Sequence, residues 1–111
     1  MPFYDLDDIP EELVTPKHST ALGRLITGEQ VEFGILRFKA GEGAKMHSHP
    51  HEQVVYMLRG RMRVTLDSEV MEIGPGQAAL FPSNAPHKTD VLEDAEVVSV
   101  KGIVGGVGHR I

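Results

Sequence analysis

Short apolar segments, separated by glycine and proline, dominate the chain from residue 22 onward. Each is about as long as a β-strand, and many are rich in the Val, Ile, Leu and Phe that favour strands. No segment after residue 20 shows the periodicity of an α-helix. The pattern predicts an all-β sandwich or barrel. We expect strands at 22–27, 31–39, 54–58, 61–66, 69–73, 78–81 and 96–104.

The two ends of the chain differ from this central region. Pro2, Pro10 and Pro16 interrupt the first residues, so we expect an extended arm over 1–20 and one domain over 21–111. Four glycines between positions 102 and 108 indicate a flexible or glycine-turned end, and the simplest interpretation is an edge strand followed by a loose terminus.

Composition and charge narrow the function classes. The 111 residues include no Cys, which excludes a disulfide scaffold and a thiolate metal site and suits a cytoplasmic location. Eleven basic and sixteen acidic side chains give a formal net charge of -5, which would repel nucleic acid and anionic membranes. No apolar run approaches the length of a membrane span. We therefore expect neither a nucleic acid nor a membrane as a partner.

Two histidines near the middle of the chain have the spacing of metal ligands. Side chains two residues apart in a strand face the same way, so His47 and His49 can converge on one ion. Pro50 then turns the chain, and the returning strand brings Gln53 opposite the pair. A second proline-rich segment ends at His87, which only a barrel or sandwich would bring to the same place.

The fourth ligand is either Glu52 or Gln53. The carboxylate of Glu52 is chemically the better donor. However, a shift of one residue puts a strand side chain on the opposite face, so the spacing favours Gln53, which would bind through its carbonyl oxygen.

These two segments resemble the two motifs of the cupin superfamily. Glycine, histidine and proline occur at the family's spacing, in the order Gly41, His47, His49, Gln53 and Gly60, then Gly76, Pro82, Asn84 and His87. Three positions depart from the family pattern: Gln53 replaces the usual Glu, Asn84 replaces Gly, and Val91 stands where a final Asn is usual. The resemblance implies an antiparallel jelly-roll β-barrel, also called a double-stranded β-helix.

The resemblance also implies a ligand set and a reaction class. The segment from His47 to Gln53 is similar to a cupin subgroup that binds its metal with three His and one Gln. That subgroup includes pectin-pathway enzymes that open unsaturated uronates, and some lyases. Small cupins commonly form homodimers, for which the 1–20 arm and the glycine-rich end would be interface segments.

The neutral ligand set suggests what would bind. Three imidazoles and an amide leave the charge of a divalent ion uncompensated, so the site should attract a small anionic ligand. The donors suit one divalent transition metal ion, which is Ni, Zn, Fe, Mn or Cu. The leading hypothesis is a metal-dependent enzyme with isomerase, ring-opening or lyase chemistry. A metal-dependent dioxygenase or other oxidoreductase and a non-catalytic binding or sensor cupin stay open as alternatives.

Other side chains are candidates for the surroundings of the ion. His51, in the turn after Pro50, is either an exposed turn residue or a catalytic group at the pocket mouth. Arg37 shares a face with Phe33 and Ile35, and it either clamps a substrate carboxylate or pairs at the rim.

Three apolar residues belong either to the core or to the lining of a small cavity: Phe38, Met57 and Phe81. We expect Glu52 to face outward, and we expect His18 and His109 to lie at the surface.

Overall fold

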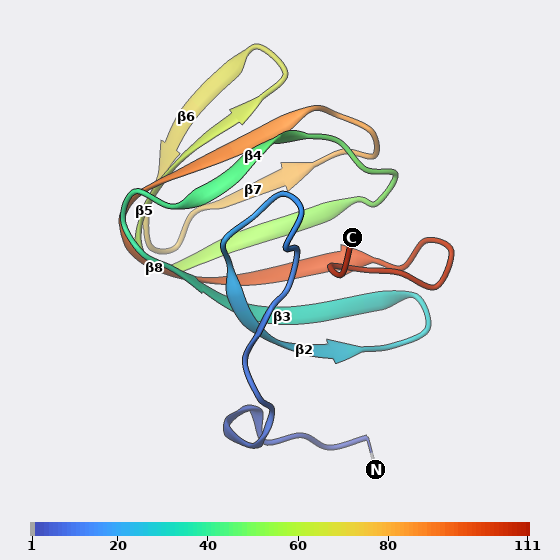
Figure 1. The fold of residues 1–111 in the computed structure, drawn as a ribbon. Coiled ribbons are helices and arrows are strands. Elements are labelled where there is room, and N and C mark those ends of the chain that lie inside the picture. The colour runs from blue at the N-terminus through green and yellow to red at the C-terminus, as the bar shows by residue number, and fades with distance from the viewer. Residues whose placement is uncertain (1) are drawn as a thin grey trace.

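Eight β-strands and one short 3-10 helix make up the regular structure of the computed structural model, which describes residues 2–111 (Figure 1). No helix in this range is long and apolar enough to cross a membrane. The all-β prediction is confirmed. In chain order the elements are η1 (Leu6–Asp8), β1 (Glu12–Leu13), β2 (Leu22–Thr27), β3 (Val31–Phe38), β4 (Gly43–His47), β5 (Gln53–Leu66), β6 (Glu69–Ile73), β7 (Ala78–Phe81) and β8 (His87–Gly102).

All strand pairs are antiparallel, and two long strands hold the sheet together. The order along the sheet is β1-β2-β3-β8-β5-β6, while β4 also pairs with β8 and β7 with β5. The first part of β8 pairs with β4 and its second part with β3. In the same way, β5 pairs first with β7 and then with β6. Figure 1 shows β6 at one end of the molecule and β2 and β3 at the other, with β5 and β8 passing between them.

Alternate positions of the strands face the interior. In β3 the buried positions are 32, 34, 36 and 38, and β8 buries its odd-numbered residues from 95 to 101. The largest fully buried apolar side chains are Phe81, Met57 and Met62. Several polar side chains share this interior, namely Glu32, His49, His51, His87, Thr89, Ser99, Lys101 and His109. Because buried polar groups usually have a structural or functional reason, this concentration marks the candidate functional region.

The predicted strands differ from the observed ones at positions where glycine, small or charged residues interrupt the apolar pattern. The two segments predicted at 54–58 and 61–66 form one strand, because Gly60, with a φ of 86°, bends β5 without ending it. A Cβ at this position would lie 2.3 Å from the carbonyl oxygen of Asp94, so the close approach requires glycine. The first half of β8 and all of β4 were not predicted, since small and charged residues interrupt their apolar pattern.

The N-terminal residues lie along the sheet. Residues of β1 pair with β2, where Glu12 lies opposite Gly23 and Leu13 opposite Leu22. Val14 is only 1% exposed and belongs to the core. Met1, the first residue of the predicted arm, lies outside the described residues.

The C-terminal segment turns back into the barrel, which agrees with a glycine-turned end and contradicts the loose terminus. Val104 and Val107 form a β-bridge across Gly105 and Gly106, which both have positive φ and so reverse the chain. His109 then enters the interior and is 1% exposed.

Candidate metal centre

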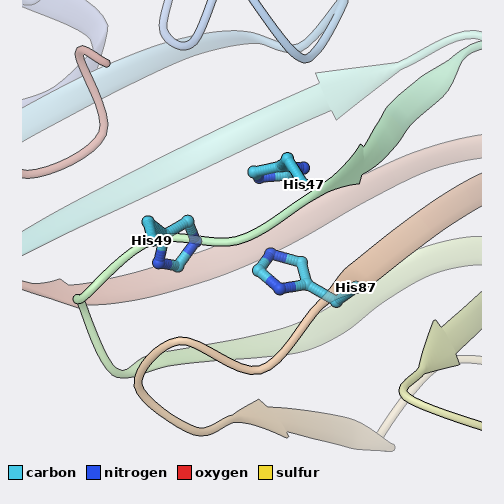
Figure 2. Close-up of side chains that lie close together, drawn as sticks. All are labelled: His47, His49 and His87. Atoms are coloured by element: carbon cyan, nitrogen blue, oxygen red, sulfur yellow. The ribbon is translucent and has the colours of Figure 1, made fainter.

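Three histidines from two distant segments meet inside the barrel (Figure 2). His47 ends β4, His49 lies in the loop that follows, and His87 begins β8 directly opposite His47. One ring nitrogen from each lies within 4.8 Å of the other two. Figure 2 shows the three rings turned toward a common point. The cluster therefore joins residues 47 and 49 to residue 87, as the spacing predicts.

Each ring is held by the same local hydrogen bond. Nδ1 of each histidine contacts a backbone carbonyl oxygen two residues away, at 2.6 Å for His47 and Lys45, 3.0 Å for His49 and His51, and 2.9 Å for His87 and Ala85. A carbonyl oxygen only accepts, so Nδ1 carries the proton and donates. The lone pair is then on Nε2, which is the arrangement of a metal-binding imidazole.

The buried Nε2 of His49 provides the test of whether a metal fits. Within residues 2–111 this atom has no hydrogen-bond partner. A buried polar atom left unpaired is unfavourable, whereas a metal ion would satisfy it. The residues present therefore fit a divalent ion, and His47, His49 and His87 would hold it.

The three imidazoles are neutral at neutral pH. Burial is the main cause that lowers the pKa of His47, His49 and His87. The nearby ammonium group of Lys101 lowers these values further, and the pKa of His49 falls to about 4. Neutral imidazoles can bind a metal without first losing a proton.

Gln53 and Glu52 occupy opposite sides of the sheet. Gln53 is partly buried and lines the same cavity as His47 and His87, while Glu52 is exposed. The side-chain Nε2 of Gln53 donates to Oγ of Ser99 at 2.9 Å, which leaves its carbonyl oxygen available for a ligand role. This placement supports Gln53 in preference to Glu52 as the proposed fourth ligand.

A cavity of about 60 Å³ lies beside the histidines. Its polar lining includes His47, His87 and Lys101, and much of its remaining wall is apolar. Phe38 and Phe81 line it, as expected of two of the three apolar candidates. The third, Met57, is completely buried in the core and is absent from the cavity wall.

The ring of Phe81 packs directly against the cluster of three histidines. Its ring stacks on that of His87, with the ring centres 4.3 Å apart and the planes 13° from parallel. On another side of the cluster, His18 stacks on His47 at 4.6 Å. His18 is therefore partly buried against the site, contrary to the prediction that it lies at the surface.

Arg37 lies on the outer face of β3, so of its two interpretations the structure agrees with the paired residue and not with the one that lines the pocket. The inward positions belong to its neighbours Leu36 and Phe38. Arg37 is exposed and forms a salt bridge of 2.6 Å with Glu11 of the N-terminal segment. It thus fastens the N-terminal segment to the barrel.

His51 is buried, so its interpretation as an exposed turn residue is wrong. It is 3% exposed, and its Nε2 contacts the backbone carbonyl oxygen of Val107 at 2.7 Å. It is absent from the cavity wall. His51 therefore connects the ligand loop to the C-terminal turn.

A chain of buried hydrogen bonds ends at the side-chain amide of Gln53, and the sequence did not predict it. Nδ1 of His109 donates to the carboxylate of Glu32 at 2.6 Å, and Nε2 of the same ring accepts from the hydroxyl of Ser99 at 2.7 Å. Ser99 in turn accepts from the amide of Gln53. The donor directions agree along the whole chain, so it fixes which end of the Gln53 amide faces Ser99.

The burial of some of these polar residues can be predicted from the alternation of the strands, whereas the burial of His109 cannot. Glu32 is in phase with the buried Leu36 and Phe38, and Ser99 and Lys101 are in phase with the buried Val97. This alternation could have placed them inside. His109 follows a glycine-rich turn, where the sequence has no periodic pattern to show its direction.

The chain matches the model of the cupin domain over residues 34–101, which is more than half of its length. The chain belongs to the cupin family. Over 64 residues, this cupin is 33% identical to oxalate decarboxylase OxdC of Bacillus subtilis strain 168. The alignment covers 53% of this chain but only 17% of that enzyme, so the chain spans a small part of its length.

Solved structures confirm the jelly-roll fold of this cupin. An RmlC-like cupin from Shewanella frigidimarina superimposes with a TM-score of 0.83 at 15% identity, covering 95% of this chain and 93% of that one. KdgF from a Halomonas species gives 0.80 at 22% identity, covering 92% and 93%. B. subtilis oxalate decarboxylase, which has Mn(II) centres, gives 0.76 at 24% identity, covering 97% and 32%.

Proposed function

We propose that this cupin is a metal-dependent enzyme with isomerase, ring-opening or lyase chemistry on a small anionic organic substrate. His47, His49 and His87 would hold one divalent transition metal ion, with Gln53 as the fourth ligand. The observation that carries the proposal is the convergence of three imidazoles whose Nδ1 atoms all donate to backbone carbonyls, so that their lone pairs are on Nε2.

The surroundings of the histidines support a reactive site. A divalent ion with four neutral ligands keeps its full charge and would supply Lewis-acid chemistry at an oxygen atom of the substrate. The apolar walls around Phe38 and Phe81 limit the access of water, which strengthens electrostatic interactions inside the cavity. The Mn(II) centres of B. subtilis oxalate decarboxylase make Mn a candidate beside Ni, Zn, Fe and Cu.

Metal removal and reconstitution test the proposal. The protein would be stripped with a chelator and reloaded with each of the five metals. It would then be assayed for loss of oxalate and of a 4,5-unsaturated uronate, with and without oxygen. We expect turnover that disappears on stripping, returns with at least one metal and does not need oxygen. Turnover that survives complete removal of metal would contradict the proposal.

Two variants make the test specific to the site. His87→Ala removes one ligand and should prevent reactivation by any metal. Glu52→Gln changes an exposed carboxylate next to Gln53 and should leave reactivation unchanged. Circular dichroism and a thermal melt of each variant would separate loss of metal from loss of fold.

The same measurements distinguish the proposed function from the two alternatives, an oxidoreductase and a non-catalytic binding protein. Oxygen consumed in proportion to product would replace the proposal with a dioxygenase or another oxidoreductase. Metal-dependent ligand binding without any product would indicate a sensor or binding protein. The fold cannot decide between these functions, because one barrel hosts many chemistries.

A further inference from the structure

Lys101 places a positive charge inside the barrel. It is the second-last residue of β8 and is only 2% exposed. Its backbone lies opposite Glu32 of β3 on one side and opposite Gln53 of β5 on the other. Its side chain lines the cavity together with His47, Gln53 and His87. Lys101 is therefore beside the candidate metal centre.

The negative charge of Glu32 attracts this ammonium group and raises its pKa against the effect of burial, but the two side chains form no salt bridge. Within residues 2–111, Lys101 has neither a salt bridge nor a side-chain hydrogen bond. The carboxylate of Glu32 interacts with other groups instead. It accepts hydrogen bonds from the backbone and ring nitrogens of His109 and from the hydroxyl of Thr27. It also lies 3.6 Å from the guanidinium group of Arg110. Glu32 is thus committed elsewhere in the barrel.

A buried charge without a partner is unfavourable. Taking an ammonium group out of water without pairing it weakens the folded state, and natural proteins rarely leave one unpaired. The burial of Lys101 accordingly lowers its pKa to about 8. An unpaired charged group that lines a cavity beside a metal site is a candidate for ligand binding.

The cavity restricts what the ligand can be. A volume of about 60 Å³ has room for roughly four to six water-sized groups. The histidines that would hold the metal ion form one part of the wall and the ammonium group of Lys101 another, and much of the remaining wall is apolar. The complementary ligand is compact and carries oxygen atoms at two points, with negative charge at one or both.

We propose that Lys101 binds a carboxylate of the ligand while the metal centre binds a second oxygen group of the same molecule. The preferred ligands are then compact dicarboxylates and 2-hydroxy or 2-oxo acids, or the carboxylate end of a larger acid that extends out of the cavity. This inference rests on the proposed function, because it requires an ion at His47, His49 and His87.

Titration calorimetry on the Mn²⁺-loaded protein tests the inference with two probes. Malonate can reach both groups, while acetate carries one carboxylate. We expect malonate to bind the unmodified protein at least about tenfold more tightly than acetate, which is the usual strength of one additional charged hydrogen bond. Lys101→Met should abolish this preference and leave the affinity for acetate within about threefold.

Lys88→Met is the matched control. It removes the same charge from the same strand, but Lys88 is 45% exposed and lies near Asp90. We expect it to bind malonate like the unmodified protein. If Lys101→Met does not fold, Lys101→Gln, which is also neutral and is more polar, takes its place with the same expected loss. An unchanged malonate preference in the folded variant would overturn the inference.

A metal titration separates this inference from the proposed function. Mn²⁺ should bind Lys101→Met at least as tightly as the unmodified protein, because a like charge has been removed. If Mn²⁺ and the other four metals fail to bind the unmodified protein, the proposed function fails. If metal binds but malonate and acetate are not distinguished, only the role of Lys101 fails.

Discussion

The buried carboxylate of Glu32 should make this protein sensitive to acid. Burial alone would raise its pKa, but hydrogen bonds from the side chain and backbone of His109 and from Thr27 outweigh that effect and lower the pKa from 4.5 to about 2. The difference of about 2.5 pH units corresponds to about 3.5 kcal/mol of stabilisation, at about 1.4 kcal/mol per unit.

The sign of the effect follows from the direction of the pKa shift. Because the pKa of Glu32 is lower in the folded protein than in the unfolded chain, its stabilisation is complete above pH 4.5. The stabilisation is lost as the pH falls through 2. At pH 2.5 about 1 kcal/mol of it should remain. Glu32→Gln removes the titrating group and should therefore remove this part of the pH dependence.

Urea denaturation at pH 6 and at pH 2.5 measures the effect on metal-free protein. The free energy of unfolding of Glu32→Gln should fall below that of the unmodified protein at pH 6, and the gap should narrow by about 2.5 kcal/mol at pH 2.5. All other ionisable groups are present in both proteins, so the gap reports Glu32 together with its partner His109, whose pKa Glu32 raises. Glu29→Gln, in the exposed turn before β3, should show no change in the gap. Parallel pH profiles for Glu32→Gln and the unmodified protein would refute the reasoning.

Four further predictions concern the metal site, the backbone and the assembly. His109→Phe should break the hydrogen-bond chain to Gln53 and weaken metal binding by about tenfold, measured by calorimetry. Gln53→Glu should tighten metal binding and weaken malonate binding, because the added carboxylate reduces the charge of the site. Gly60→Ala should lower the free energy of unfolding by about 3 kcal/mol, because the added Cβ would meet backbone atoms of Asp94 and Ala95. Gly76 has a similar φ but no atom within 4 Å of an added Cβ, so Gly76→Ala should lower it by only about 1 kcal/mol. Sedimentation equilibrium should give about twice the chain mass of 12.2 kDa for the expected homodimer.

His47 and His49 could be predicted as a ligand pair because their spacing is local. His47 and His49 are two residues apart, and the turn at Pro50 brings the chain back toward them within a few residues. His87 was placed beside them through the family's motif spacing, since nothing in the local pattern states which distant segment reaches the pair. The structure brings all three together.

The orientation of β3 could not be read from the pattern, because both of its faces carry apolar side chains. Phe33 and Ile35 on the outer face are partly buried, and Ile35 lines a groove with Leu6 of the N-terminal segment. Alternation separates two faces of a strand but does not say which one is inside when both are covered. The pattern alone therefore leaves open whether Arg37 faces the cavity or pairs outside it.

The position of His109 depends on contacts far away in the sequence. Its ring is held by Glu32 and Ser99, and its backbone carbonyl accepts from the hydroxyl of Thr15. Each partner belongs to a different segment of the barrel. A single residue after a turn has no periodic neighbours that would indicate burial, so only the assembled fold shows it.

His87 and Lys101 both face inward on β8, although the inward alternation is interrupted at the exposed Glu93 between them. A one-residue insertion between them would turn one of the two side chains outward. Exchanging a single inward side chain of this strand can therefore change which ligand is preferred and leave the other inward residues in place, whereas a one-residue change in strand length would disturb the whole site.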